Sequence, residues 1–189
     1  MRAMTVERYP DWVLGIVRPG DRRADDAALM TAALDVADAS VARGGGGPFG
    51  AVVATGDGDV VAVGWNAVVP ACDPTAHAEV VAIRRAAAAL GTWRVREHRG
   101  SPLALYTTCA PCFMCAGAIH WAGLPRVVAA ATRADAEAIG FLEGPPGVDL
   151  VAALRAVGIV YEEGLLRERA RTLLTDYRGP IYNAGDPSP

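Results

Sequence analysis

Apolar positions along the chain follow helical spacing in some segments and strand-like runs in others. Residues 25–43 carry apolar side chains at helical spacing, and the glycine run and proline at 44–48 form a stop signal. Residues 49–54 and 60–64 are rich in strand-forming residues. The short segment between them contains glycine and aspartate, which predicts a β-hairpin.

The alternation continues toward the C-terminus. Asp73 followed by Pro74 predicts a helix start, since a capping side chain before a first-turn proline is typical of one, and Gly91 is expected to end that helix. Pro111 predicts the start of a further helix that runs through Trp121. The remaining elements are expected as strands at 103–108, 126–131 and 159–162 and as helices at 134–139, 150–157 and 165–177. Strands alternating with helices predict an α/β layered fold in which at least part of the sheet is parallel.

The length and composition fit one globular domain. A chain of 189 residues can bury a substantial core, and 52% hydrophobic residues with 21% charged residues argue against disorder. No repeat or linker divides the sequence. We therefore expect an N-terminal extension at 1–24, one domain at 25–178 and a C-terminal tail at 179–189.

Charge and targeting signals narrow the classes of function. The net charge is −3, which argues against DNA as a partner because phosphate binding needs a basic surface. All 18 basic residues are arginine, so lysine-dependent chemistry such as Schiff-base formation is excluded. No signal peptide or membrane-length apolar run is found, which predicts a cytoplasmic protein without a membrane partner. Three of the four cysteines lie within seven positions, which indicates metal chemistry in a reducing compartment.

Two short segments carry the candidate chemistry, each at the start of a predicted helix. His77 lies two residues before Glu79, and Cys112 lies three residues before Cys115. Two thiolates and one imidazole suit a zinc ion and leave its fourth position open to water, whose proton Glu79 is placed to accept. Cys109 and Cys112 form a second pair of the same spacing, but Cys109 precedes the proline and is expected to end a strand. The combination of His-x-Glu with Pro-Cys-x-x-Cys is typical of zinc nucleobase deaminases.

The sequence resembles the cytidine deaminase superfamily, and within it the bacterial guanine deaminase branch. The resemblance is carried by Pro48-Phe49-Gly50, by Trp65-Asn66 leading to the segment 74–79, by the segment 111–121 and by the segment 137–143. It implies a three-layer α/β/α sandwich around a five-stranded mixed sheet, with one Zn²⁺ per subunit. The residue roles that it implies are zinc ligation by His77, Cys112 and Cys115, catalysis by Glu79 and Glu143, and substrate contact by Asn66, Phe49, Trp121, Ala78 and Tyr182.

The implied reaction is hydrolytic deamination of a free nucleobase, with guanine converted to xanthine and ammonia as the favoured case. The branch also implies a homodimer in which the C-terminal tail reaches the partner's site. The sequence departs from the family pattern at Ala110 and Leu142, where carboxylates are common. Because of these departures, amino-triazines, isoguanine and cytosine analogues are alternative candidate substrates. A tRNA adenosine deaminase and a purely structural zinc protein are two competing interpretations of the same motifs. Four further cysteines and histidines, Cys72, Cys109, His98 and His120, are expected to be structural.

Overall fold

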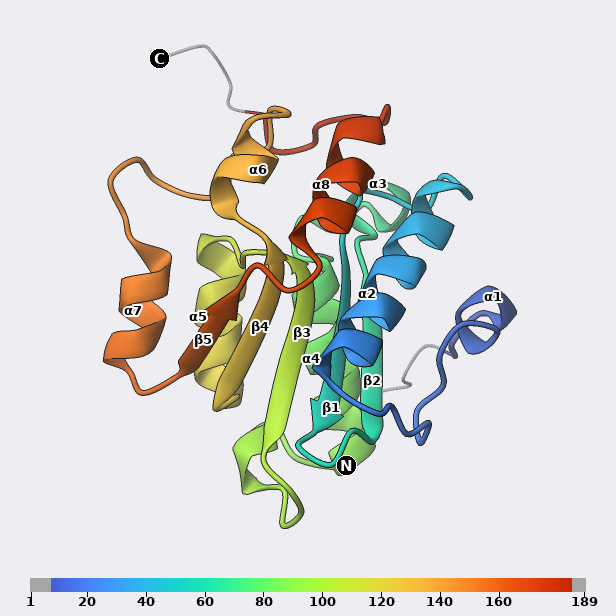
Figure 1. Cartoon of the computed structure of the whole chain (residues 1–189), viewed down its shortest axis with the longest axis vertical. Coiled ribbons are helices and arrows are strands. Elements are labelled where there is room, and N and C mark those ends of the chain that lie inside the picture. The colour runs from blue at the N-terminus through green and yellow to red at the C-terminus, as the bar shows by residue number, and fades with distance from the viewer. Residues whose placement is uncertain (1–7, 185–189) are drawn as a thin grey trace.

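A five-stranded mixed sheet lies between two layers of helices in the computed structural model, which describes residues 8–184 (Figure 1). The strands lie in the order β2-β1-β3-β4-β5. Helices α2 and α8 cover one face, and α4 and α5 cover the other. The strands are β1 (Gly50–Thr55), β2 (Val60–Trp65), β3 (Leu103–Cys109), β4 (Arg126–Ala131) and β5 (Val160–Glu163), and the helices are α1 (Asp11–Leu14), α2 (Asp26–Val41), α3 (Val68–Ala71), α4 (Ala78–Leu90), the 3₁₀ turn η1 (Val95–Glu97), α5 (Phe113–Ala122), α6 (Arg133–Glu137), α7 (Leu150–Ala156) and α8 (Arg167–Asp176).

The sheet is antiparallel on one side and parallel on the other. β1 pairs antiparallel with both β2 and β3, whereas β3, β4 and β5 run parallel. Parallel neighbours need crossover connections, and α5 and α7 supply them. The expected three-layer sandwich with its five-stranded mixed sheet is therefore confirmed.

Two glycines let the helices approach the sheet closely. A side chain at Gly64 in β2 would collide with the carbonyl oxygen of Ala78, and one at Gly50 in β1 would collide with that of Ala33 in α2. Only glycine fits where backbone atoms approach so closely. The start of α4 is thereby held directly against the hairpin, which fixes the position of His77.

The predicted start of the second helix was wrong. The Asp73 carboxylate accepts hydrogen bonds from the backbone and hydroxyl of Thr75 and so closes a turn, while α4 begins only at Ala78. The short helix α3 before it was not predicted. Similarly, α5 begins at Phe113, two residues later than Pro111 suggested, with Cys112 as its N-cap.

The segment before α2 packs against the domain. Val13 and Val17 are fully buried, and the Tyr9 hydroxyl accepts a hydrogen bond from the backbone N–H of Val63 in β2. The outermost parts of the expected extension and tail, 1–7 and 185–189, lie outside the described residues. Across the described part of the chain, each helix is too short or too polar to span a bilayer.

Candidate active site

Three potential metal ligands converge where α4 and α5 begin. His77 is the N-cap of α4, Cys112 is the N-cap of α5, and Cys115 lies in the first turn of α5. The His77 Nδ1 atom lies 3.5 Å from Cys112 Sγ and 3.6 Å from Cys115 Sγ. All three ligand atoms lie within 4.8 Å of one another. The sequence prediction of this ligand set is thus matched by the geometry.

These separations fit a tetrahedral zinc ion. With Zn–S bonds of about 2.3 Å and a Zn–N bond of about 2.0–2.1 Å, a tetrahedral angle places nitrogen and sulfur about 3.5 Å apart. The two observed distances agree with this value. Among residues 8–184 the ligand group has these three members, so one tetrahedral position stays open, as in catalytic rather than structural zinc sites.

The electrostatic surroundings favour the thiolate form of Cys112. Hydrogen bonding from Cys115, followed by that from His77, outweighs burial and lowers the pKa of Cys112 to about 4. The backbone N–H of Cys115 also points at the Cys112 sulfur, 3.5 Å away. Placing this cysteine at a helix N-terminus therefore prepares it as an anionic ligand.

A small pocket adjoins the ligands and contains two buried carboxyl groups. Its walls are formed by Phe49, Asn66, His77, Glu79, Cys109, Ala110, Glu143 and Tyr182. Burial, followed by the charge of Cys112, raises the pKa of Glu79 to about 7 and that of Glu143 to about 8. Both carboxyl groups are therefore poised to exchange protons near neutral pH.

The loop that carries Glu143 is attached to the metal-binding helix. The Glu143 carbonyl oxygen accepts a hydrogen bond of 2.9 Å from the backbone N–H of Phe113, the residue after Cys112. The side chain is buried rather than solvated, although it lies in a loop rich in proline and glycine. The geometry thus places it in the same pocket as Glu79.

The orientation of the Asn66 amide is set by backbone groups. Its Oδ1 accepts hydrogen bonds from the N–H groups of Gly47 at 3.0 Å and Val68 at 3.4 Å. Its Nδ2 donates to the Tyr182 hydroxyl at 2.7 Å. Since the oxygen is engaged by the backbone, Asn66 offers its N–H group to the pocket.

Aromatic rings close the pocket on the side of Asn66. Phe49 packs edge-to-face on Phe141, and Tyr182 packs edge-to-face on both Phe141 and His77. Phe141 is fully buried and was not among the predicted site residues, although the Ile-Gly-Phe segment belongs to the family resemblance. Cys109, expected to be only structural, also contributes to the pocket wall.

Two predicted substrate contacts do not reach the pocket of their own chain. Trp121 lies in the last turn of α5, nine residues and about 13 Å along the helix from Cys112, and its side chain is 71% exposed. Ala78 is fully buried, with its carbonyl against Gly64 in β2. Leu142 is 52% exposed and does not line the pocket, which reduces the importance of this departure from the family pattern.

Comparison with known proteins agrees with this site. The sequence model of the cytidine and deoxycytidylate deaminase zinc-binding region matches residues 23–131. A guanine deaminase of Bacillus subtilis is 47% identical over 113 residues, which cover 60% of this chain and 69% of that protein. The solved structure of a guanine deaminase from Nitrosomonas europaea is similar with a TM-score of 0.84 and 36% identity, covering 90% of this chain and 93% of the other.

A relative with another substrate matches a similar part of the chain less strongly. A tRNA-specific adenosine deaminase of Haemophilus influenzae is 37% identical over 115 residues, covering 61% of this chain and 63% of that protein. The resemblance to the Nitrosomonas structure, in contrast, extends over nearly the whole chain. The chain belongs to the cytidine and deoxycytidylate deaminase family of zinc-binding hydrolases and, within it, is a guanine deaminase-like nucleobase deaminase.

Proposed function

We propose that this protein hydrolyses guanine to xanthine and ammonia, with one water molecule consumed in each turnover. The observation that carries the proposal is the pairing of Glu79 with Glu143 in one pocket beside the three metal ligands. The guanine deaminases of Bacillus subtilis and Nitrosomonas europaea support the choice of substrate.

Glu79 is assigned to the proton that the attacking water loses. His77, Cys112 and Cys115 would hold a zinc ion, which would act as a Lewis acid and lower the pKa of water to about 7. Burial raises the pKa of Glu79 to about 7, so its carboxylate accepts a proton from the water and passes it to ring nitrogen N3 as C2 becomes tetrahedral.

Glu143 is assigned to the departing amine. Its carboxyl group is buried and its pKa is raised to about 8, so the protonated form is populated at neutral pH. That form donates a proton to the amino nitrogen on C2, and ammonia leaves as the C–N bond breaks. The C2 hydroxyl then returns its proton to the Glu143 carboxylate as the C2 carbonyl of xanthine forms. Two carboxyl groups with different surroundings thereby divide the proton transfers between them.

Asn66 is assigned to recognition of the base. Because the backbone occupies its oxygen, its Nδ2 group faces the pocket, where the Tyr182 hydroxyl accepts from one of its two N–H donors. A base bound there therefore has to present an acceptor to this group. The O6 and N7 atoms of guanine are both acceptors, whereas adenine carries a donor at the position of O6. Phe49 supplies an apolar wall for the ring.

We also propose that the protein is a homodimer. Phe113, Gly117 and Trp121 form a stripe at helical spacing on α5, and the two aromatic side chains are 58% and 71% exposed. An exposed aromatic stripe of this kind is typical of a subunit interface. If the C-terminal tails were exchanged between subunits, Tyr182 would line the partner's pocket instead of its own. Light scattering measures whether a dimer forms, and cross-linking of the tail distinguishes a dimer with exchanged tails from one without.

The test of the proposed reaction is ammonia release from a panel of bases by the zinc-loaded protein. The panel contains guanine, isoguanine, adenine, cytosine, an amino-triazine and the matching nucleosides, together with a tRNA anticodon arm. Guanine is expected to be the best substrate, and Glu79→Gln is expected to abolish turnover with zinc content unchanged. Inosine formation on the RNA, or activity on nucleosides alone, would contradict the proposal.

A further inference from the structure

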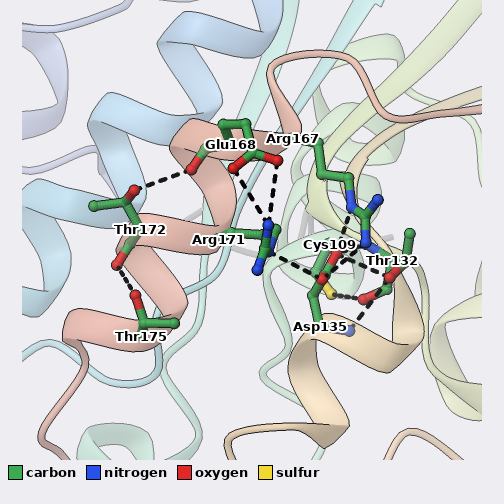
Figure 2. Close-up of polar contacts among 8 residues, drawn as sticks. All are labelled: Cys109, Thr132, Asp135, Arg167, Glu168, Arg171, Thr172 and Thr175. Carbon is green, nitrogen blue, oxygen red and sulfur yellow. Dashed lines mark hydrogen bonds and ion pairs between the residues drawn. The ribbon is translucent and has the colours of Figure 1, made fainter.

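One nearly buried carboxylate ties helix α8 to helix α6 (Figure 2). Asp135 accepts hydrogen bonds from the backbone N–H and the hydroxyl of Thr132 at 2.9 and 2.8 Å, which caps α6. It also accepts two hydrogen bonds from Arg167 in a bidentate arrangement, 2.9 Å from Nε and 3.0 Å from Nη2. Arg171 adds a contact of 3.4 Å from the next turn of α8. The Asp135 side chain is only 10% exposed, so these charged hydrogen bonds are partly shielded from water.

On the α6 side, the network reaches two parts of the pocket wall. The Thr132 carbonyl accepts a hydrogen bond from the thiol of Cys109, which lines the pocket (Figure 2). Helix α6 leads directly into the loop that carries Glu143, and Arg133 holds that loop through the carbonyls of Gly144 at 3.0 Å and Val148 at 3.1 Å. The position of α6 therefore governs where the Glu143 carboxyl group lies.

On the α8 side, the network reaches the segment that closes the pocket. Helix α8 ends at Asp176, and the chain then turns back so that Tyr182 lines the pocket and contacts Asn66. Asn183 donates a hydrogen bond of 2.6 Å to the carbonyl of Leu142, next to Glu143. The closing segment and the Glu143 loop thus meet at the pocket, while Asp135 joins the helices from which they extend.

We propose that Asp135 is a positioning residue for the deamination reaction, acting through Arg167 to set the Glu143 loop relative to the segment that carries Tyr182. The expected effect on catalysis rests on the proposed function. The link between α6 and α8 through Asp135 does not depend on the identity of the substrate. A displacement of about 1 Å at reacting groups costs up to about 100-fold in rate, so a loosened link reduces turnover without removing a catalytic group.

The chain offers a matched control on the same helix. Arg169 in α8 pairs with Asp35 and Asp38, on the α2 side of the helix, and its side chain is about as exposed as that of Arg167. Arg167→Gln and Arg169→Gln remove the same charge from the same helix, but only the first loosens α8 from α6. Asp135→Asn keeps a side-chain oxygen that accepts from the N–H and hydroxyl of Thr132, and it removes the charge that binds Arg167.

The experiment measures hydrogen exchange, zinc content and guanine kinetics for these three variants of the zinc-loaded protein. Arg167→Gln and Asp135→Asn are expected to speed backbone hydrogen exchange in both 140–148 and 177–184. They are also expected to lower kcat about 10- to 100-fold while zinc content is unchanged. For Arg169→Gln, the exchange rates and kcat are expected to stay within about twofold of the parent values. Equal exchange and equal kcat in Arg167→Gln and Arg169→Gln would overturn the inference. If the parent protein does not deaminate guanine, the proposed function fails, while the exchange comparison still decides whether Asp135 couples the two segments.

Discussion

The Asn66 Nδ2 group donates a 2.7 Å hydrogen bond to the Tyr182 hydroxyl, across 116 positions of sequence. Both side chains line the pocket beside the metal ligands. The phenol accepts from one of the two N–H donors of this amide, so it competes with guanine for the group that we assign to the base. Burial raises the pKa of Tyr182, so the hydroxyl stays protonated and can accept from Asn66 across the neutral range.

Tyr182→Phe is expected to tighten binding of the base. The substitution removes a hydrogen bond of the free protein worth about 1 kcal/mol, which lowers KM by up to roughly fivefold because the hydroxyl no longer competes with the base for the Asn66 amide. The free protein loses a similar amount of stability. Steady-state kinetics with guanine and the inhibition constant of xanthine measure the effect. Tyr177→Phe is the control, since the Tyr177 hydroxyl donates to the carbonyl of Pro180 rather than contacting Asn66. A higher KM in Tyr182→Phe would contradict the prediction and would indicate that the Tyr182 hydroxyl contacts the substrate.

Asn66→Asp is expected to separate recognition from folding. An aspartate keeps the oxygen that accepts from Gly47 and Val68, so the loop retains its hydrogen bonds. It replaces the donor that faces the pocket by an acceptor, which opposes the O6 and N7 acceptors of guanine and lowers kcat/KM roughly 100-fold. Asn66→Ala should lose both activity and stability, because the backbone N–H of Gly47 is left without its partner. Equal guanine activity in Asn66→Asp and the parent would remove Asn66 from base recognition.

The metal ligands could be predicted from sequence because each signal is local. His77 and Glu79 are two residues apart, and Cys112 and Cys115 are one helical turn apart, so the chemistry is set by spacing within a few residues. The sheet was predictable for a similar reason, since its hairpin and its strand-helix alternation are read from neighbouring segments. The contact of Asn66 with Tyr182 is different, because nothing local in the sequence pairs positions so far apart.

The wrong helix start at Asp73, and the features that the sequence leaves open, also have physical causes. Aspartate caps turns as readily as helices, so Asp73 suggested a helix start where the structure has a turn closed by Thr75. The side-chain direction of Trp121 depends on how α5 is rotated against its neighbours, which the family motif does not specify. Glu143 is buried because the loop around it is held by Phe113 and Arg133, and these contacts are visible only in the fold.

Asp26→Asn is expected to destabilise the protein at neutral pH and to have little effect in acid. The Asp26 carboxylate pairs with Arg126 and accepts from the Tyr106 hydroxyl, joining the start of α2 to the sheet. Hydrogen bonding to Arg126 is the main reason that its pKa lies below the usual value. A depressed carboxyl pKa adds stability above the unfolded-state pKa of about 4, and that stability is lost as the pH falls through the folded-state value. Urea unfolding at pH 7 and at pH 3 measures the difference, and a gap between parent and variant that persists unchanged at pH 3 would contradict the prediction.

Removal of zinc is expected to abolish turnover and also to loosen the junction of α4 and α5. His77, Cys112 and Cys115 come from the first residues of two helices, so a metal ion that binds only the folded chain stabilises that junction by linkage. Dialysis against a chelator should lower Tm by on the order of 5–10 °C, and added zinc should restore both Tm and activity. Cys112→Ser and Cys115→Ser should retain less zinc, as measured by metal analysis of the purified protein. Cys109→Ser is the matched control. The Cys109 thiol is buried in the same pocket wall, but it donates a hydrogen bond to the Thr132 carbonyl and lies outside the ligand group. If Cys109→Ser lost as much zinc as Cys115→Ser, the assigned ligand set would be wrong.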